Sequence, residues 1–445
     1  MMNTDIIRST EKFNKDMVLG FYVFVFVITV MIIFVTELFG WSNRFIWIVF
    51  AVFGVHMAFL AIRWSIRYHV RENGLKNAFK AYRLISGFKR QLIYAGVYTQ
   101  INEWFSGQRL AKLPDIDYEI DTSTSGFIPK ILIRDSVNVS NKIYSNDWSS
   151  AFGRYSVESQ YLSKDSNYWI FELDDVQISH RLEFTDENEY VSAVRNKGKY
   201  EILVDERLSY SIFHTLVVGQ SGSGKSYFVN HLLLSFMIKG WNDVFVVDPK
   251  RSDMFNFGKL FGDRHSASDL PEIMTMFDRI EDMVKRRKNQ VNELLKSHDN
   301  VDYRYFGLNP IILVFDEYLS FQGMIKRQKK EVRDKFENTL STLILEGRQI
   351  GVFVVISMQK SGADSIPTEW RNQLKFKLLL GHSEDTDYKT TFGTDKPPKR
   401  LLGAGQGWYK LSGSTMMPKY VETPKIGFQM MKLARKLSRE MQISK

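Results

Sequence analysis

The feature that most constrains this chain is a glycine-rich segment that follows the apolar run 216–218. Its eight residues, called here the phosphate loop, are Gly219, Gln220, Ser221, Gly222, Ser223, Gly224, Lys225 and Ser226. They fill every fixed position of the pattern G-x-x-x-x-G-K-[ST], in which backbone N–H groups at a helix N-terminus approach a polyphosphate. The lysine places a charge near the β- and γ-phosphates, and the last hydroxyl is a ligand for Mg²⁺. The segment predicts an ATP and Mg²⁺ site at 219–226 and Tyr227, with a strand before it and a helix running to Ile238.

An acidic pair follows a second apolar run. Residues 310–315 are continuously apolar, as expected of a strand buried on both faces of a sheet, and Asp316 and Glu317 come directly after them. In a phosphate-loop protein the first carboxylate binds Mg²⁺ and the second polarises the attacking water. A solvated helix start would explain the pair if the phosphate loop were absent. Together the motifs predict an ATPase, with Ser226 and Asp316 as metal ligands and Lys225 and Glu317 as catalytic residues.

Composition limits the number of domains and the kinds of site that the chain can contain. The 445 residues suffice for two or three domains, and 44% hydrophobic with 25% charged residues is ordinary for a folded protein. The chain has no cysteine, which excludes disulfides, thiolate metal sites and cysteine nucleophiles. Its eight histidines show no metal-ligand spacing.

Two long uncharged stretches near the N-terminus predict a membrane anchor. Neither residues 17–36 nor residues 45–62 contain a charged side chain. Each stretch can cross a hydrocarbon core about 30 Å thick as a helix. We therefore expect a transmembrane hairpin at 17–63, with helices at about 17–37 and 45–62. A cleaved signal peptide fits less well because a second span follows at once, and buried core helices are the other alternative.

Positive charge flanks both apolar stretches. Residues 1–16 carry Arg8, Lys12 and Lys15, and residues 63–112 carry ten lysines and arginines against two glutamates. Because cytoplasmic flanks are enriched in Lys and Arg, we expect a multi-pass protein of the cell membrane with both termini in the cytoplasm. Attraction to anionic lipid headgroups explains the basic segment slightly better than contact with nucleic acid.

The sequence pattern changes after the expected membrane anchor. Residues 64–114 form a basic juxtamembrane segment that we expect to be helical. Residues 115–206 contain strand-like runs, among them 127–133 and 168–173, between turn residues. These runs predict a small β-rich or α+β domain with no visible catalytic constellation.

An α/β pattern begins at about residue 207 and continues to 420. The expected strands are 215–218, 244–247, 311–315 and 351–357, and a long helix is expected at about 269–297. Alternating strands and helices predict a parallel sheet, and residues 421–445 are expected to form a C-terminal tail. Two basic stretches, 285–288 and 326–330, are most simply solvated faces, but either would suit contact with DNA.

Five ordered blocks of residues 214–420 resemble the motor domain of the FtsK/SpoIIIE-type DNA translocases. The blocks are 214–226, 246–250, 314–317, 346–359 and 401–407. The resemblance implies a RecA-like core, a homo-hexameric ring and translocation along double-stranded DNA. It also implies that Gln359 senses the γ-phosphate from the end of its strand. Arg348 matches an arginine that would reach a neighbouring subunit's nucleotide, although a structural salt bridge is an equal alternative.

The chain also departs from the chromosome translocases of that family. It has two expected spans instead of about four, and only 418–445 follow the motor, too few for a winged-helix reader domain. Two spans, a small domain and a terminal motor resemble the TcpA-type coupling proteins of Gram-positive conjugative elements. This resemblance implies a membrane-anchored ATPase that brings relaxase-bound DNA to a type IV secretion channel. It implies a relaxase and secretion-channel proteins as partners. The alternatives are a double-stranded DNA pump for chromosome or plasmid segregation, a protein-export ATPase and a non-hydrolysing membrane adaptor.

Overall fold

The structure is a computed structural model whose described residues form two compact units, Met1–Gln177 and Ile178–Lys445. The division after Gln177 differs from the expected one after 206. The described residues are 8–9, 20, 22–31, 34, 44–102, 109–120, 128–146, 148, 150–362, 365–393, 397, 400–415 and 417–443.

One described helix is long and apolar enough to cross a membrane. This helix, α2 (Arg44–Arg67), contains the apolar window Phe50–Arg67, whose side chains are not buried in the protein. A shorter apolar helix spans Tyr22–Met31. Eight of the twenty residues of the first expected span, 17–36, lie outside the described residues, so the transmembrane hairpin stays a prediction.

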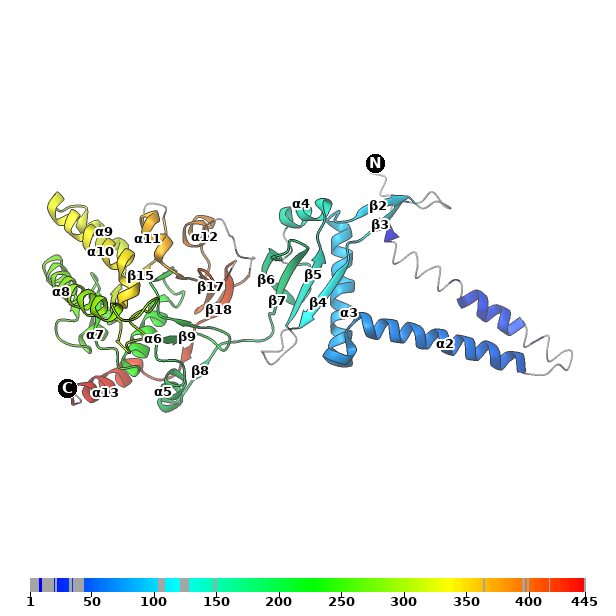
Figure 1. The fold of residues 1–445 in the computed structure, drawn as a ribbon, viewed down its shortest axis with the longest axis horizontal. Coiled ribbons are helices and arrows are strands. Elements are labelled where there is room, and N and C mark those ends of the chain that lie inside the picture. Colours follow the sequence, from blue (N-terminus) through cyan, green and yellow to red (C-terminus); the bar gives the residue numbers. More distant parts are fainter. Residues whose placement is uncertain are drawn as a thin grey trace. The chain divides into compact units, whose positions relative to one another are not determined.

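The first unit packs a helix against an antiparallel sheet (Figure 1). Phe88, on the helix, stacks on Phe152 with ring centroids 4.3 Å apart and contacts Phe171 on the central strand β7. The expected helix over 64–114 ends at 94, and an antiparallel strand pair follows it. The bounds are α3 Val70–Tyr94, β1 Arg8–Ser9, β2 Thr99–Asn102, β3 Arg109–Lys112, β4 Ile116–Ile120, β5 Pro129–Arg134, α4 Val137–Ser145, β6 Tyr155–Leu162 and β7 Tyr168–Asp175.

The second unit contains an eight-stranded sheet in the order β13-β12-β14-β15-β11-β16-β17-β18. The first six strands are parallel and the last two are antiparallel. The predicted parallel α/β arrangement is therefore confirmed. The bounds are β11 Thr215–Gly219, β12 Val244–Val247, β13 Ser266–Ala267, β14 Ile311–Phe315, β15 Val352–Met358, β16 Phe376–Leu380, β17 Gln406–Leu411 and β18 Lys419–Glu422.

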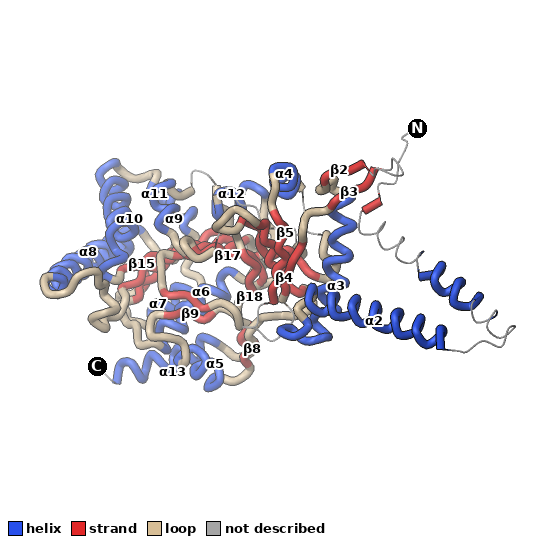
Figure 2. Tube along the Cα trace, turned by 45° about the vertical axis from the view of Figure 1, so that its right-hand side comes forward, coloured by secondary structure: helices blue, strands red, loops and turns tan. Residues whose placement is uncertain are grey.

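Helices cover both faces of this sheet, with α10 and α13 on opposite sides of β15 (Figure 2). Successive strand residues point to opposite faces. Val217 therefore joins the core that contains α6, whereas Leu216 and Val218 join the core that contains α8 and α10. The helix bounds are α6 Lys225–Ile238, α7 Asp253–Lys259, α8 Leu270–Leu295, α9 Tyr318–Ile325, α10 Lys330–Ile350, α11 Thr368–Gln373, α12 Asp385–Phe392 and α13 Met430–Ile443.

Both ends of the second unit pack on α6. At its start, Tyr190 lies in the same core as α6, and β8 pairs with β19 in parallel. At its end, Leu433 of α13 enters that core, so the expected C-terminal tail contains a packed helix. These contacts explain why 178–206 join the second unit. The remaining bounds are β8 Glu183–Phe184, α5 Glu187–Arg195, β9 Glu201–Leu203, β10 Ser209–Ser211 and β19 Lys425–Ile426.

A buried histidine on α6 makes the stability of this unit depend on pH. The Nε2 atom of His231 lies 2.8 Å from the Leu203 carbonyl oxygen, and its Nδ1 atom lies 2.8 Å from the Tyr190 hydroxyl. Burial lowers the pKa of His231 to about 4. Since a histidine in an unfolded chain titrates near 6.5, the unfolded state binds more protons between pH 6.5 and 4. Its contribution to stability is therefore complete above pH 6.5 and is lost as the pH falls toward 4.

We predict that His231→Gln flattens the acid side of the stability profile. The wild-type free energy of unfolding should fall by up to about 3 kcal/mol more than that of the variant between pH 6.5 and 4. Urea unfolding followed by tryptophan fluorescence at a series of pH values measures both curves. Equal slopes for the two proteins would show that His231 does not titrate between the folded and unfolded states.

Candidate nucleotide-binding site

The phosphate loop joins the end of β11 to the start of α6. Gly222 and Gly224 have φ angles of 83° and 94°, a region that favours glycine. A Cβ atom on Gly224 would lie 2.7 Å from the Gly405 nitrogen, so this position also has no room for a side chain. The first N–H groups of α6 point back into the loop without helical partners, which makes its N-terminus suited to an anion.

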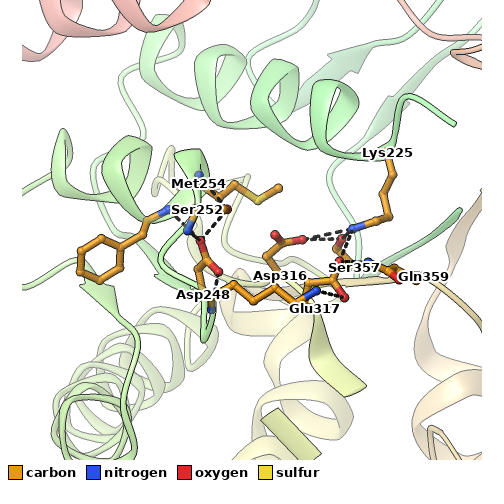
Figure 3. A network of polar contacts seen from close by, with 10 residues as sticks. Lys225, Asp248, Ser252, Met254, Asp316, Glu317, Ser357 and Gln359 are labelled. Atoms are coloured by element: carbon orange, nitrogen blue, oxygen red, sulfur yellow. Dashed lines mark hydrogen bonds and ion pairs between the residues drawn. The ribbon is translucent and has the colours of Figure 1, made fainter. Parts of the chain in front are cut away.

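Lys225 is almost buried, with 5% of its side chain exposed, and its ammonium group lies among oxygen atoms (Figure 3). Its Nζ atom donates to Ser357 Oγ at 2.8 Å and lies 3.3 Å from Asp316 Oδ1. Ser357 Oγ in turn donates to the same Asp316 oxygen at 2.9 Å. A buried charge requires partners of this kind. Lys225, Asp316 and Ser357, called here the lysine clasp, hold the ammonium group directly beside the phosphate loop.

Strand order explains why the clasp forms. Strand β15 lies between β14, which ends before Asp316, and β11, which ends in the phosphate loop. Parallel strands have their carboxyl ends at the same edge of a sheet, where ligands bind in open α/β folds. Lys225 therefore reaches across the end of β15, and Ser357 near that end bridges the gap.

A second group of contacts surrounds Glu317. Gln359 Nε2 donates to Glu317 Oε1 at 2.8 Å (Figure 3). Lys250 Nζ lies 3.4 Å from Glu317 Oε2. Glu317 has a φ angle of 51°, a left-handed conformation that costs a non-glycine residue of order 1 kcal/mol or more. The structure thus brings together four of the sequence-predicted residues, namely Lys225, Asp316, Glu317 and Gln359.

The residues at this site suit Mg²⁺ and a polyphosphate. Ser226 is exposed in the first turn of α6, and Ser223 Oγ is buried without a hydrogen-bond partner among the described residues. Among those residues no group of three or more His, Asp or Glu side chains is able to hold a metal ion. Magnesium bound with substrate phosphates needs only one or two carboxylates, so Asp316 with Ser226 is a sufficient protein ligand set. The site can therefore hold a magnesium nucleotide.

Two predicted residues point elsewhere. The Tyr227 hydroxyl exchanges hydrogen bonds with the backbone of Ile426 on β19. Arg348 is exposed in the last turn of α10, just before β15 begins. The clasp lies at the other end of β15, and a strand rises about 3.3 Å per residue, so Arg348 is roughly 20 Å from the clasp. It lies near His214, whose pKa is lowered to about 4 by burial and then by the charge of Arg348. Arg348 is therefore outside its own chain's site, and a role at a neighbour's nucleotide stays a proposal.

Three contributors to the site were not assigned roles from the sequence. Ser357 is a polar residue inside the apolar strand β15, which is the one signal that would have identified it. Lys250 and Gly405 lie in two of the blocks that carry the family resemblance, 246–250 and 401–407, but their contacts come from loops far from the phosphate loop in sequence, so the sequence did not indicate their roles.

Asp248 organises the loop that carries Lys250. Its carboxylate accepts hydrogen bonds from the backbone nitrogens of Lys250, Ser252 and Phe255 and from the Ser252 hydroxyl, at 2.7 to 3.2 Å. These bonds fix the turn between β12 and α7. We predict that Asp248→Ala lowers the free energy of unfolding by about 2–4 kcal/mol, because four donors, of which the Phe255 nitrogen is buried, lose their acceptor.

Urea unfolding measures this effect, with Asp253→Ala on the exposed first turn of α7 as the matched control. The control should cost less than about 1 kcal/mol. Equal losses in the two variants would contradict a structural role for Asp248.

Comparisons with known proteins relate part of this chain to a known family. Residues 165–305, a range that contains the phosphate loop and Asp248, match the FtsK/SpoIIIE family. The FtsK-domain-containing protein YdcQ of Bacillus subtilis is 25% identical over 219 residues, which are 49% of this chain and 45% of that protein. The DNA translocase FtsK of Staphylococcus aureus (strain Mu50) is 24% identical over 218 residues, 45% of this chain and 27% of that protein.

The aligned region thus spans less than half of the length of these curated relatives. Among solved structures, the pCW3 conjugation coupling protein TcpA in its monomer form with ATPγS has a TM-score of 0.49 and 18% identity, covering 75% of this chain and 94% of that chain. EssC of Geobacillus thermodenitrificans has a TM-score of 0.46 and 14% identity, covering 60% of this chain and 52% of that chain. The resemblance to the FtsK/SpoIIIE translocases is confirmed by the sequence relatives and by the family match, which covers residues 165–305 of this chain.

Proposed function

We propose that the chain is a membrane-anchored ATPase that moves DNA. The observation that carries the proposal is the lysine clasp, which sets Lys225 and Asp316 beside a complete phosphate loop in a domain of the FtsK/SpoIIIE family. Relatives named DNA translocases share this domain, which supports DNA as the substrate.

Each residue of the site has a role in this proposal. Lys225 exchanges Asp316 and Ser357 for the β- and γ-phosphates, and Asp316 and Ser226 would hold Mg²⁺ once the ammonium group has left Asp316. Bound Mg²⁺ would supply charge neutralisation on the phosphates. Glu317 orients the attacking water, and Gln359, which is hydrogen-bonded to Glu317, links this carboxylate to the γ-phosphate position.

The basic stretch 326–330 is the better candidate for DNA contact. Lys326, Arg327, Lys329 and Lys330 are exposed between α9 and α10, and α9 begins directly after Glu317. Side chains of 285–288 already have partners within the chain, since Lys288 pairs with Glu346 and Arg287 donates to two carbonyl groups. A change at Glu317 therefore has a short covalent route to the 326–330 stretch.

The finer role that we propose is coupling in conjugative transfer. The order of an apolar helix, a small mixed unit and a motor supports it, together with the sequence resemblance to TcpA-type coupling proteins. In this proposal the anchor is a two-span hairpin of the cell membrane, and the motors form a homo-hexamer in which Arg348 reaches a neighbour's nucleotide. The DNA arrives with a relaxase and passes to secretion-channel proteins. A double-stranded DNA pump is the second candidate, favoured by the FtsK relatives.

We predict DNA-stimulated ATP hydrolysis by the full chain in nanodiscs. Lys225→Ala and Glu317→Gln should each lower the turnover rate by about 100-fold or more, because each removes a group that acts on the transferred phosphate. Glu331→Gln, an exposed carboxylate in the first turn of α10, is the matched control and should retain the wild-type rate. Stimulation mainly by single-stranded DNA favours transfer coupling, and stimulation mainly by duplex favours the pump. Nucleotide binding without turnover in the presence of either DNA would contradict the motor proposal.

DNA binding should depend on the basic stretch 326–330. Replacing Lys326 and Lys329 together by alanine should weaken binding and reduce the slope of log K against log salt by about 1 per lysine. Fluorescence anisotropy with labelled DNA at several salt concentrations measures the slope. The double variant of Lys285 and Lys288 is the control, and an equal effect in both pairs would leave no special role for 326–330.

A further inference from the structure

The far side of the phosphate loop is closed by a segment that comes much later in the chain. Strand β11 has β15 on the side of Asp316 and β16 on the other side. The turn 403–405, which leads into β17, lies on that second side. The Gly405 nitrogen donates to the Ser223 carbonyl at 2.8 Å, and the Gly405 backbone lies against Gly224. Gly405 is therefore in direct contact with the phosphate loop.

An arginine occupies the space that a side chain at position 405 would fill. Gly405 has a φ angle of 76°, and a Cβ atom built there would collide with the guanidinium group of Arg181. The charge of Arg181 also reaches the first turn of α6. Burial raises the pKa of Tyr227, and a hydrogen bond from Ile426 and the charge of Arg181 oppose that rise. The guanidinium group therefore lies beside Gly405, whose backbone is in contact with the phosphate loop.

Arg181 is held in place by the backbone and by a buried carboxylate. Its Nε atom donates to the Thr423 carbonyl at 2.9 Å, and its backbone nitrogen donates to Ser179 Oγ at 3.2 Å. Glu422, which is 3% exposed, accepts hydrogen bonds from Ser179 Oγ at 2.9 Å and from the His180 nitrogen at 2.7 Å. Gln406 Nε2 donates to the other oxygen of Glu422 at 2.9 Å. Glu422 thus ties 179–181 to the strands that follow the turn at Gly405.

The charge of Arg181 has no carboxylate partner within ion-pair distance in the described part of the chain. Guanidinium groups bind phosphate through two parallel hydrogen bonds, so a fixed arginine beside a phosphate loop suits a nucleotide. Lys225 and Asp316 mark the side of the β- and γ-phosphates and the metal. Arg181 lies against Gly405 on the opposite side of the loop. The α-phosphate, which precedes the β- and γ-phosphates in the chain of a nucleotide, is the group that a guanidinium on that side would meet.

We infer that Arg181 binds the α-phosphate of the nucleotide held by its own chain, and that Glu422 is the positioning residue for Arg181. The inference rests on the nucleotide site proposed above and adds a contact from outside the predicted motor, which was expected to begin at 207. It also means that the segment leading in from the first unit touches the bound nucleotide.

The test is nucleotide binding by the full chain in nanodiscs, measured as dissociation constants for ADP and for ATPγS. Arg181→Ala should weaken both by about tenfold or more, the loss expected for a hydrogen-bonded charge, and by the same factor because both carry the α-phosphate. Arg181→Lys keeps the charge but loses the paired hydrogen bonds, and should lose about threefold. Arg207→Ala is the matched control, because Arg207 donates to the Tyr420 carbonyl on β18, and should stay within about twofold of wild type.

A purely structural role for Arg181 predicts other results. In that case Arg181→Ala would have a lower melting temperature than wild type in the absence of nucleotide. The folded Arg181→Lys variant would bind nucleotide with the wild-type affinity. Unchanged affinities, or a loss confined to ATPγS, would overturn the inference. Glu422→Gln should weaken ADP binding in the wild-type background but not further in Arg181→Ala, and additive losses would remove its positioning role. If the wild-type protein binds nucleotide but does not hydrolyse it, the motor proposal is refuted, and the binding constants still decide the role of Arg181. If the wild-type protein binds no nucleotide, both proposals are refuted.

Discussion

The burial of the Lys225 ammonium group is the constraint on which the rest of the site depends. A charge that is 5% exposed is tolerable only with partners in place, and removing one partner of such a pair typically costs about 3–5 kcal/mol. Asp316 and Ser357 meet this need, and they reach Lys225 because β14, β15 and β11 are adjacent and parallel. The order of the strands in the sheet is therefore what allows Lys225 to be buried beside the phosphate loop.

The opposite side of the phosphate loop is also closely packed. Gly224 and Gly405 approach so closely that neither admits a side chain, and the room left at Gly405 is taken by Arg181. Segments more than 200 residues apart in sequence thus meet at the loop. Glu422 ties the start of the second unit to its last strands through hydrogen bonds from Ser179, His180 and Gln406.

Much of the motor was predictable from sequence because its central strands are continuous apolar runs followed by motif residues. Strand β14 with Asp316 is the clearest case. The packed helix α13 was not predictable, since its partner α6 lies about 200 residues away and only tertiary contact makes it part of the core. Ser357 and Arg181 were missed for the same reason, whereas the distance of Arg348 from its own chain's site follows from strand direction alone. Eight of the twenty residues of the first expected membrane span, 17–36, lie outside the described residues, and the span stays a prediction.

In the proposed mechanism the lysine clasp opens to bind a magnesium nucleotide. A cryo-electron microscopy structure of the full chain with Mg²⁺ and ATPγS tests it most directly. The account predicts nucleotide at 219–226, with Lys225 moved from Asp316 to the phosphates and the metal between Ser226 and Asp316. Nucleotide bound elsewhere, or an unchanged contact between Lys225 and Asp316 beside bound nucleotide, would contradict it.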